Sequence, residues 1–236
     1  MNQLREAVIL VGGLGTRLRS VVADRPKVLA EVNGKPFLAY LLEQVAAAGI
    51  THTVLCTGYR GEQVQTAFGE QYAGMQLSFS QETTLLGTGG ALRLALPQLS
   101  TSTFLALNGD SFCEVNLADF WAWHLAHQAR ASLILSHQAD TSRYGRVSSS
   151  ANGAIQSFDE KDNVSGPGWI NAGLYLLSSE LLEALPPNEV ISLERQVFPK
   201  WIGQGLFGFP NQGRFVDIGT PESYAQAAAL VTGNFR

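Results

Sequence analysis

Ala7-Val-Ile-Leu-Val11 runs directly into Gly12-Gly-Leu-Gly-Thr-Arg-Leu-Arg19, and Asp24-Arg-Pro-Lys27 follows four residues later. The first five residues form a short apolar run rich in β-branched side chains, which is typical of a buried parallel strand. The glycines after it allow positive φ angles and let backbone N–H groups converge on one anion. Arg17 offers a bidentate guanidinium for phosphate oxygens, and Lys27 adds a second positive charge. The stretch therefore predicts a phosphate-binding loop at the end of the first strand.

Two well-known phosphate-binding loops do not fit this stretch. A P-loop ends in Gly-Lys-Ser/Thr, which is absent here. The dinucleotide-binding fingerprint needs a small residue where this chain has Leu18, and no acidic ribose ligand follows at the expected distance. A strand followed by glycines is by itself also compatible with an ordinary tight turn. The rest of the chain has to decide between the two interpretations.

The composition is that of a globular protein with neither a nucleic-acid nor a membrane partner. Of the 236 residues, 45% are hydrophobic and 15% charged, which is enough to bury a sizeable core. A net charge of −4 without a basic run argues against nucleic-acid binding. No apolar run reaches membrane-spanning length and no signal peptide precedes the first strand, so we expect a cytoplasmic protein. Cys56 and Cys113 are then expected to be free thiols.

Short apolar strands alternate with helical segments along most of the chain. The expected strands cover residues 7–11, 28–32, 53–57, 75–79, 104–107, 131–135, 170–177 and 214–218. The expected helices cover residues 37–48, 62–68, 91–96, 117–127, 193–202 and 221–230, the last one capped by Thr220. Such alternation predicts an α/β fold with a Rossmann-like, doubly wound, mostly parallel sheet, whose ligands bind at the carboxyl ends of the strands.

The alternation of strands and helices changes around Tyr144. Asn152-Gly153 separates two short strand-like segments, 146–148 and 154–158, and this dipeptide is a strong signal for a β-hairpin. We therefore expect a mixed central sheet with an inserted antiparallel hairpin. The whole chain, 1–236, is predicted to form one domain with a first part of about residues 1–136 and a second part of residues 137–236.

Polar side chains follow several of these strands. The candidates are Gln81-Glu82, the glycine loop Leu86-Gly-Thr-Gly-Gly90, Asp110, Glu160-Lys161, Asn171 and Asp217. Amide side chains and backbone groups near the glycine loop suit the edge of a nucleobase. Each candidate alone has an ordinary structural explanation, such as an Asx turn for Asp110 or a surface ion pair for Glu160 with Lys161. Their order along the chain favours an active site.

A pair of histidines is a weaker candidate. His124 and His127 lie three residues apart on the expected helix 117–127, but no carboxylate stands at the right step to complete a metal site. We expect the two histidines to be solvated or at the edge of the core, and Phe120, Trp121 and Trp123 to be core aromatics.

The ordered set Gly12-Gly13-x-Gly15-Thr16-Arg17-Leu18 with Pro26-Lys27 resembles the signature of the nucleoside-triphosphate:sugar-1-phosphate nucleotidyltransferases, and the resemblance extends from Ala7 to Glu222. It implies the nucleotidyltransferase fold and a Mg²⁺-dependent transfer of a nucleotidyl group to a sugar 1-phosphate, with release of pyrophosphate. The nucleotide-binding residues that it implies are Val11, Gly12, Gly13, Gly15, Thr16, Arg17, Lys27, Gln81, Gly87, Thr88 and Asp110. Those for the sugar phosphate are Gly145, Glu160, Lys161 and Asn171; those for Mg²⁺ are Asp110 and Asp217. Arg17, Lys27 and Asp110 are the catalytic residues in this assignment.

The residue types fit that chemistry independently. The attacking oxygen of a sugar phosphate is already an anion, so the reaction needs charge neutralisation and in-line positioning and no general base. Arg17, Lys27 and Lys161 carry suitable charges, and two carboxylates suit a magnesium ion that also binds water and phosphate oxygens. The first part of the chain would then bind the nucleotide and the second part the sugar phosphate.

Within the family, the stretches 24–37 and 192–195 resemble most the D-glycero-D-manno-heptose 1-phosphate guanylyltransferases, enzymes of nucleotide-sugar biosynthesis for cell-surface polysaccharides. This implies GTP as the donor. Val11 and Leu85 depart from the family's usual alanine and proline, and both flank the expected base pocket. A mannose-1-phosphate guanylyltransferase and a uridylyl- or thymidylyltransferase stay open as alternatives. A catalytically silent, nucleotide-sensing regulatory subunit is the alternative from another class, and a homo-oligomer is compatible with the sequence.

Overall fold

The computed structural model describes residues 3–13, 15–18, 21–22, 24–159 and 165–231. The elements follow in the order β1 (Glu6–Leu10), η1 (Thr16–Leu18), η2 (Lys27–Leu29), β2 (Glu31–Val32), β3 (Lys35–Pro36), α1 (Phe37–Ala47), β4 (His52–Thr57), α2 (Gly61–Phe68), β5 (Gln71–Tyr72), β6 (Met75–Gln81), α3 (Gly87–Ala95), η3 (Leu96–Gln98), β7 (Thr103–Asn108), β8 (Ser111–Cys113), α4 (Leu117–Ala126), β9 (Ala131–Gln138), β10 (Arg146–Ser149), β11 (Ile155–Asp159), β12 (Gly168–Ser178), α5 (Ser179–Glu183), η5 (Leu193–Val197), α6 (Phe198–Trp201), β13 (Leu206–Asn211), β14 (Phe215–Asp217) and α7 (Pro221–Leu230).

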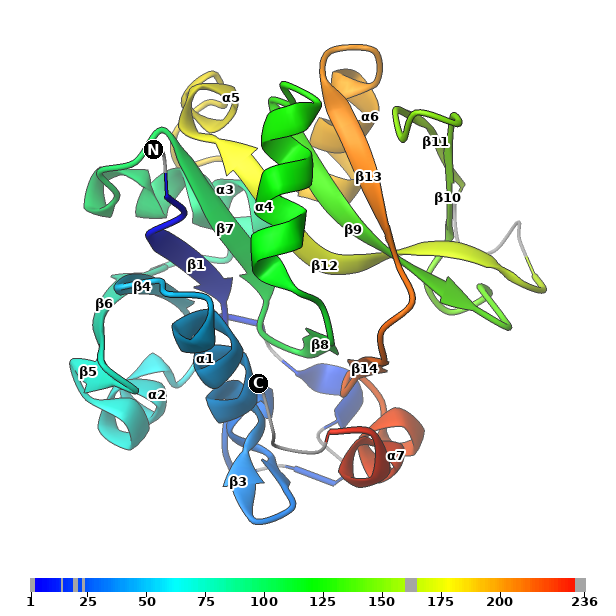
Figure 1. The fold of residues 1–236 in the computed structure, drawn as a ribbon. Coiled ribbons are helices and arrows are strands. Elements are labelled where there is room, and N and C mark those ends of the chain that lie inside the picture. The colour runs from blue at the N-terminus through cyan, green and yellow to red at the C-terminus, as the bar shows by residue number, and fades with distance from the viewer. Residues whose placement is uncertain (1–2, 14, 19–20, 23, 160–164, 232–236) are drawn as a thin grey trace.

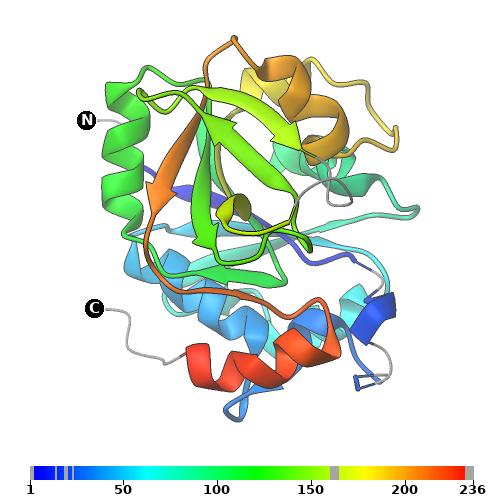
Figure 2. The same cartoon turned by 90° about the vertical axis from the view of Figure 1, so that its right-hand side faces the viewer.

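Within these residues, eight strands form one sheet in the order β13-β9-β12-β7-β1-β4-β6-β5. β1 runs parallel to both of its neighbours, β4 and β7, and β6 continues the parallel part. β12 is antiparallel to β7 and β9, whereas β13 is parallel to β9. Helices lie on both faces of the sheet (Figures 1 and 2). The predicted α/β fold with a mixed, mostly parallel sheet is confirmed.

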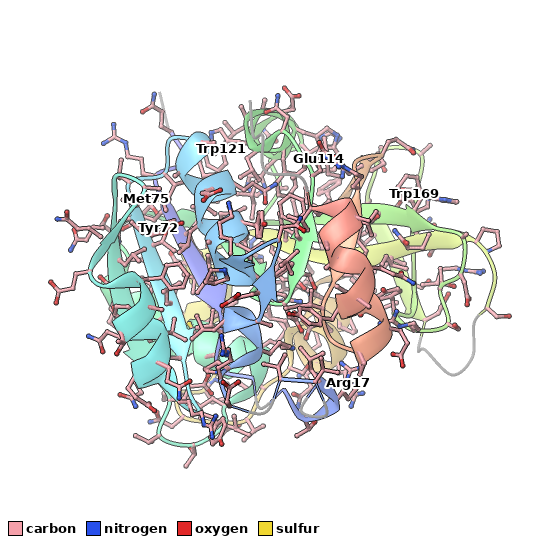
Figure 3. All side chains as sticks on the ribbon, turned by 90° about the horizontal axis from the view of Figure 1, so that it is seen from below. Arg17, Tyr72, Met75, Glu114, Trp121 and Trp169 are labelled. Carbon is pink, nitrogen blue, oxygen red and sulfur yellow. The ribbon has the colours of Figure 1, made fainter. Side chains whose placement is uncertain are left out.

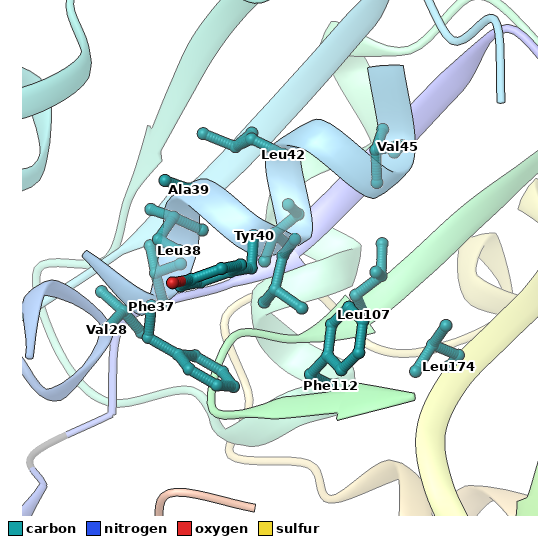
Figure 4. Packing of buried hydrophobic residues seen from close by; sticks show 14 of the residues in the cluster. Val28, Phe37, Leu38, Ala39, Tyr40, Leu42, Val45, Leu107, Phe112 and Leu174 are labelled. Carbon is teal, nitrogen blue, oxygen red and sulfur yellow. The ribbon is translucent and has the colours of Figure 1, made fainter. Parts of the chain in front are cut away.

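The two faces of the sheet bury separate hydrophobic clusters, because successive side chains of a strand point to opposite sides. On β1, Ile9 packs on the face covered by α1, and Val8 packs on the face covered by α3. On β7, Leu107 likewise packs on the face covered by α1, and Ala106 packs on the face covered by α3. Figure 4 shows side chains of α1 gathered with Leu107 in the first of these clusters. Central strands buried on both faces read as continuous apolar runs, which is why the sequence revealed them.

One predicted strand is wrong in part. Residues 28–32 were expected to be extended, but Lys27–Leu29 form a single 3₁₀ turn and only Glu31–Val32 form a strand. The short hairpin explains the difference: the turn at Asn33 and Gly34, with φ angles of 52° and 75°, leaves two residues on each side to pair. The 3₁₀ turn begins at Lys27, so the change affects a predicted site residue directly.

Other elements were missed or divided. β13 contains Gly208 and Pro210, which both disfavour a strand assignment, and β8 is only three residues long. The helix expected over 193–202 consists of a π-helical turn, η5, followed by α6. Pro199 lies in the first turn of α6, where a missing backbone N–H is tolerated. The glycines Gly87–Gly90 belong to the first turn of α3, which therefore starts four residues earlier than expected.

The expected hairpin and the final helix cap are present. β10 and β11 pair antiparallel in a small sheet of their own, on either side of Asn152-Gly153. Thr220 Oγ1 accepts a hydrogen bond from the backbone N–H of Ser223 and closes a capping box at the start of α7. No helix within the described residues is long and apolar enough to cross a membrane.

The cysteines and the aromatic helix α4 are mostly as expected. Cys56 and Cys113 are buried free thiols. His124 is buried and hydrogen-bonded to Ser132 Oγ at 2.7 Å, so its ring is part of the core. Phe120 is fully buried, whereas Trp121 and Trp123 are only half-buried; Trp121 packs against the cluster on the α1 face of the sheet.

Candidate active site

Two cavities meet at the carboxyl end of β7. The first, of about 260 Å³, is lined by Leu10, Val11, Gly12, Gly13, Lys27, Val28, Glu82, Leu85, Gly87, Thr88, Ala91, Asn108 and Asp110. The second, of about 300 Å³, is lined by Asn108, Asp110, Ser111, Tyr144, Gly145, Arg146, Val147, Phe158, Asp159, Asn171, Ser192, Glu194, Arg195, Phe215 and Asp217. Asn108 and Asp110 line both. The sheet thus holds two adjacent binding spaces with a carboxylate at their boundary.

Asp110 is placed by a close contact between two strands. The N–H of Gly109 donates to the Leu10 carbonyl at 2.9 Å, and a side chain at position 109 would lie 2.6 Å from that oxygen. Only glycine fits there, so the end of β7 stays against the end of β1. This contact brings Asp110 beside the glycine-rich loop after β1.

Lys27 and Asp110 form an ion pair, in which the side chains are 16% and 24% exposed. Burial opposes ionisation of Asp110, but the charge and hydrogen bond of Lys27 outweigh it and lower the pKa of Asp110 below its usual range. Asp110 is therefore a carboxylate at neutral pH, and the ammonium group of Lys27 is held at the boundary of the two cavities.

Asp217 reaches the same boundary through the short β8–β14 ladder. Asp217 stands opposite Ser111, and the N–H of Ile218 donates to the Asp110 carbonyl at 2.9 Å. Burial and then the negative charge of Asp110 raise the pKa of Asp217. The Asp217 Oδ1 atom accepts a hydrogen bond of 2.6 Å from the Gly219 N–H and lies 3.9 Å from an Arg143 guanidinium nitrogen.

This pair of carboxylates fits a magnesium ion. Both groups offer hard oxygen ligands. Burial and, after it, repulsion from Asp110 raise the pKa of Asp217, and a divalent cation would relieve this repulsion. In the part of the chain that the structure describes, no group of three or more His, Cys, Asp or Glu side chains is arranged to hold a metal. The remaining ligands would come from water and phosphate, which is usual for Mg²⁺.

The basic loop after β1 lies at the rim of this site. Gly15 has the predicted positive φ, 59°, and Thr16 and Arg17 are exposed in the turn η1. A side chain on Gly219 would come within 3.4 Å of Arg17 Nη2, so the guanidinium lies over the turn that also holds Asp217. Figure 3 shows Arg17 at the edge of the molecule, near α7. Gly15, Thr16 and Arg17 do not line either cavity.

The first cavity contains most of the predicted nucleotide residues but not Gln81. Gln81 is exposed at the end of β6, and its neighbour Glu82 lines the cavity instead. Strand alternation explains the exchange, because adjacent side chains point to opposite sides. The Glu82 Oε2 atom accepts the Leu86 N–H at 2.7 Å, and Oε1 lies beside Gly12. Burial raises the pKa of Glu82.

The second cavity contains Gly145 and Asn171 from the predicted set. Glu160 and Lys161 lie outside the described residues, although Asp159, directly before them, lines this cavity. Sequence reasoning missed Glu194, which lies in η5 and lines the cavity with its neighbours. The sequence shows a carboxylate in the stretch Ser192-Leu-Glu-Arg195, but nothing in it indicates that this stretch lies near β12.

Comparisons of the sequence with known proteins point to nucleotidyltransferases. The family model for Nucleotidyl transferase matches residues 6–234. A D-glycero-α-D-manno-heptose 1-phosphate guanylyltransferase from Aneurinibacillus thermoaerophilus is 36% identical over 94% of this chain and 96% of its own length. A mannose-1-phosphate guanylyltransferase from Mycobacterium tuberculosis is 34% identical over 97% of this chain, but the match spans only 65% of that longer protein.

A solved structure extends the agreement to three dimensions. The crystal structure of HddC from Yersinia pseudotuberculosis superposes with a TM-score of 0.86 at 32% identity, covering 96% of this chain and 99% of HddC. The same protein complexed with GMP-PN superposes with a TM-score of 0.85. The family predicted from the glycine-rich loop is thereby confirmed, and this chain belongs to the Nucleotidyl transferase family.

Proposed function

We propose that this enzyme transfers a guanylyl group from GTP to a sugar 1-phosphate, best a D-glycero-D-manno-heptose 1-phosphate, and releases pyrophosphate. The observation that carries the proposal is the boundary between the two cavities, where Lys27 and Asp110 are paired and Asp217 is held beside them. Two substrates bound in adjacent cavities would have their reacting phosphates at this boundary. The names of the heptose-specific relatives, which this chain matches over nearly their whole length, support the choice of substrates.

The chemistry is displacement at the α-phosphate of the nucleotide. The sugar phosphate oxygen attacks phosphorus, and the bond from the α-phosphorus to the bridging oxygen of pyrophosphate breaks. Asp110 and Asp217 would hold a Mg²⁺ ion, which neutralises phosphate charge when bound. Lys27 stabilises charge on the α-phosphate, and Arg17 at the rim binds the leaving pyrophosphate. Lys161 would bind the incoming sugar phosphate, a role that rests on the family resemblance alone.

Glu82 supports guanine as the base. Guanine presents two neighbouring donors on its Watson–Crick edge, N1–H and the N2 amino group, and a carboxylate accepts both. Adenine would place its N1 acceptor against the carboxylate, and uracil and thymine each offer one donor flanked by carbonyl oxygens. Glu82 lines the first cavity together with the Gly87-Thr88 loop and Val11, so a half-buried acceptor stands among the predicted base-binding residues.

The two-part organisation belongs to the same proposal. The first cavity is lined by residues between Leu10 and Asp110, and the second by residues between Asn108 and Asp217. A nucleotide-binding part of about residues 1–136 and a sugar-phosphate-binding part of residues 137–236 agree with that division. A cytoplasmic location, where GTP and sugar phosphates are available, is also part of the proposal.

Substrate panels test the proposal directly. Pyrophosphate release should be measured with GTP, ATP, UTP, dTTP and CTP against heptose, mannose and glucose 1-phosphates in the presence of Mg²⁺. We expect GTP with the heptose 1-phosphate to be fastest. Faster use of UTP or dTTP would contradict the guanylyl assignment, and a preference for mannose 1-phosphate would contradict the heptose assignment. Chelation with excess EDTA should abolish turnover.

A further inference from the structure

Glu194 lines the second cavity, contacts Thr88 of the first, and is not needed by the chemistry described above. It belongs to η5, a π-helical turn, and such turns are often found at functional sites. The carboxylate lines the second cavity and accepts hydrogen bonds from three hydroxyl groups: Thr88 at 2.8 Å, Ser192 at 3.0 Å and Tyr175 at 3.3 Å. Thr88 lines the first cavity, so one carboxylate contacts residues of both binding spaces.

On the nucleotide side, the direction of the Thr88 hydroxyl is fixed. Its oxygen accepts the Leu193 N–H at 2.8 Å, and its proton is donated to Glu194. The segment carrying Glu194 is also bound to the glycine loop through its backbone. Ile191 N–H donates to the Leu86 carbonyl, and Gly89 N–H donates to the Ile191 carbonyl, both at 2.8 Å. A displacement of this loop would therefore displace Glu194 as well.

On the sugar side, the link runs through Tyr175, which is fully buried on β12 and lines neither cavity. Its hydroxyl accepts a hydrogen bond from the amide of Asn171 at 3.0 Å. Because a carboxylate can only accept, the phenol proton is donated to Glu194. Burial and the Glu194 carboxylate raise the pKa of Tyr175 well above its usual value, so the phenol remains a donor.

These contacts also fix the orientation of Asn171. Its Oδ1 accepts the Gly173 N–H at 2.9 Å, and its Nδ2 donates to Tyr175. The second Nδ2 proton is then a donor for a ligand in the second cavity, which Asn171 lines. The continuous path Thr88–Glu194–Tyr175–Asn171 joins the nucleotide cavity to that donor. Through this path, a change at one end can be transmitted to the hydrogen bonds at the other.

We infer that Glu194 is a positioning residue that couples occupancy of the nucleotide cavity to binding of the sugar 1-phosphate in the second cavity. The inference rests on the proposed function, because it assumes which substrate enters each cavity. Nucleotide binding orders the Thr88 loop, Glu194 holds the Tyr175 proton, and Asn171 presents its donor to the sugar. The affinity for sugar 1-phosphate is therefore higher when nucleotide is bound, and by linkage the reverse holds as well.

The test is a binding cycle by titration calorimetry with Mg²⁺. The nucleotide probe is guanosine 5′-(α,β-methylene)triphosphate, which cannot be cleaved at the reacting bond, and the sugar probe is D-glycero-D-manno-heptose 1-phosphate. The measured quantity is the ratio of sugar-phosphate Kd without and with the nucleotide probe. We expect a ratio of at least about 5 for the native enzyme, the lower end of ordinary coupling between sites.

Two variants interrupt the path at different places. Glu194→Gln removes the charge, and Tyr175→Phe removes only the buried hydroxyl outside both cavities. Both should bring the ratio close to 1, with the Kd for nucleotide alone changed less than about twofold in Tyr175→Phe. Tyr72→Phe is the matched control, because Tyr72 donates to Glu43 at the same 3.3 Å, away from both cavities. It should keep the native ratio.

The outcomes separate the inference from the proposed function. A native enzyme that binds neither probe contradicts the proposed function itself. Binding of both probes with a ratio near 1 in the native enzyme overturns the inference alone. So does a native ratio that persists in Glu194→Gln and Tyr175→Phe. If Glu194→Gln does not fold, as judged by its thermal unfolding, the Tyr175→Phe result decides.

Discussion

At the scale of single residues, the carboxylates at the cavity boundary have distinct environments. Lys27 lowers the pKa of Asp110, whereas burial and the Asp110 charge raise the pKa of Asp217. The first carboxylate is thus kept ionised by the protein itself. The second gains most from a cation, since a bound metal would compensate the charge of its neighbour.

Replacing either carboxylate by its amide should collapse turnover. Asp110→Asn and Asp217→Asn keep the side-chain shape but remove one negative charge from the Mg²⁺ ligands, and we expect kcat to fall by at least about 10²-fold, as when one electrostatic group is lost from an active site. Asp119→Asn on the exposed face of α4 is the control and should keep full activity. Near-native kcat at saturating Mg²⁺ in a folded variant would remove that residue from the proposed metal site.

Base selectivity should depend on Glu82. In Glu82→Gln, the amide oxygen still accepts the guanine N1–H. The amide NH2 group, however, faces the N2 amino group of guanine, which is also a donor, so GTP is disfavoured. Xanthine carries a carbonyl oxygen at that position, and XTP should be accepted. We expect the ratio of kcat/KM for GTP over XTP to fall by about 10²-fold or more. Glu62→Gln, at an exposed position of α2, should leave the ratio unchanged. An unaltered ratio in Glu82→Gln would show that guanine is read elsewhere.

At the scale of elements, β1 is fixed at its N-terminal end by Glu6. This carboxylate is 5% exposed and accepts hydrogen bonds from the backbone and hydroxyl groups of Ser100 and Thr101, and it contacts His52 at 3.1 Å. Burial alone would raise the pKa of Glu6, but these hydrogen bonds outweigh it and lower the pKa to about 2. The strand that carries the glycine-rich loop is thus attached to the segment before β7.

This attachment should make stability depend on acid. The pKa of Glu6 is lower in the folded than in the unfolded chain, so its contribution is fully present above about pH 4.5 and is lost as the pH falls towards about 2. The contribution is about 3 kcal/mol, from 1.36 kcal/mol for each pKa unit. Urea unfolding at pH 7 and pH 3 should show a smaller decrease for Glu6→Gln than for the native protein. Equal decreases would mean that Glu6 does not carry this effect.

The elements also show how far the sequence leads. Strands buried on both faces, such as β1 and β7, can be recognised in the sequence as continuous apolar runs. The dipeptide Asn152-Gly153 correctly predicted the hairpin of β10 and β11. β13 was hidden because Gly208 and Pro210 interrupt its pattern. Glu82 lines the first cavity where Gln81 was predicted, a difference of one residue. Adjacent side chains of a strand point to opposite sides, and the amino-acid composition does not show which of the two points into the cavity.

The candidate site was predictable where its residues follow a strand directly. Asp110 and the glycine-rich loop come from adjacent parallel strands, whose carboxyl ends meet by the rules of the fold. Glu194 could not be found in this way. It lies 106 residues after Thr88 in the chain, and only the fold brings the two side chains into contact. Contacts of this kind depend on the packing of η5 against α3, and no local pattern encodes that packing.

At the scale of the whole molecule, the sheet places two cavities side by side and gives each its own part of the chain. Asn108 is shared by both, and its Oδ1 is buried without a hydrogen-bond partner among the described residues. A substrate in either cavity could donate to this atom, since buried acceptors are normally satisfied. The arrangement suits two ligands that react with each other more than it suits one ligand that is only sensed.

The fate of the α-phosphorus distinguishes an enzyme of this kind from a catalytically silent, nucleotide-sensing subunit on the same fold. The enzyme should be incubated with [α-³²P]GTP, Mg²⁺ and D-glycero-D-manno-heptose 1-phosphate, and the products separated by ion-exchange chromatography. We predict that the label moves into a GDP-sugar, with one pyrophosphate released for each molecule formed and no transfer without the sugar phosphate. Label that stays in GTP while both ligands bind, or that appears as free GMP independently of the sugar phosphate, would contradict guanylyl transfer.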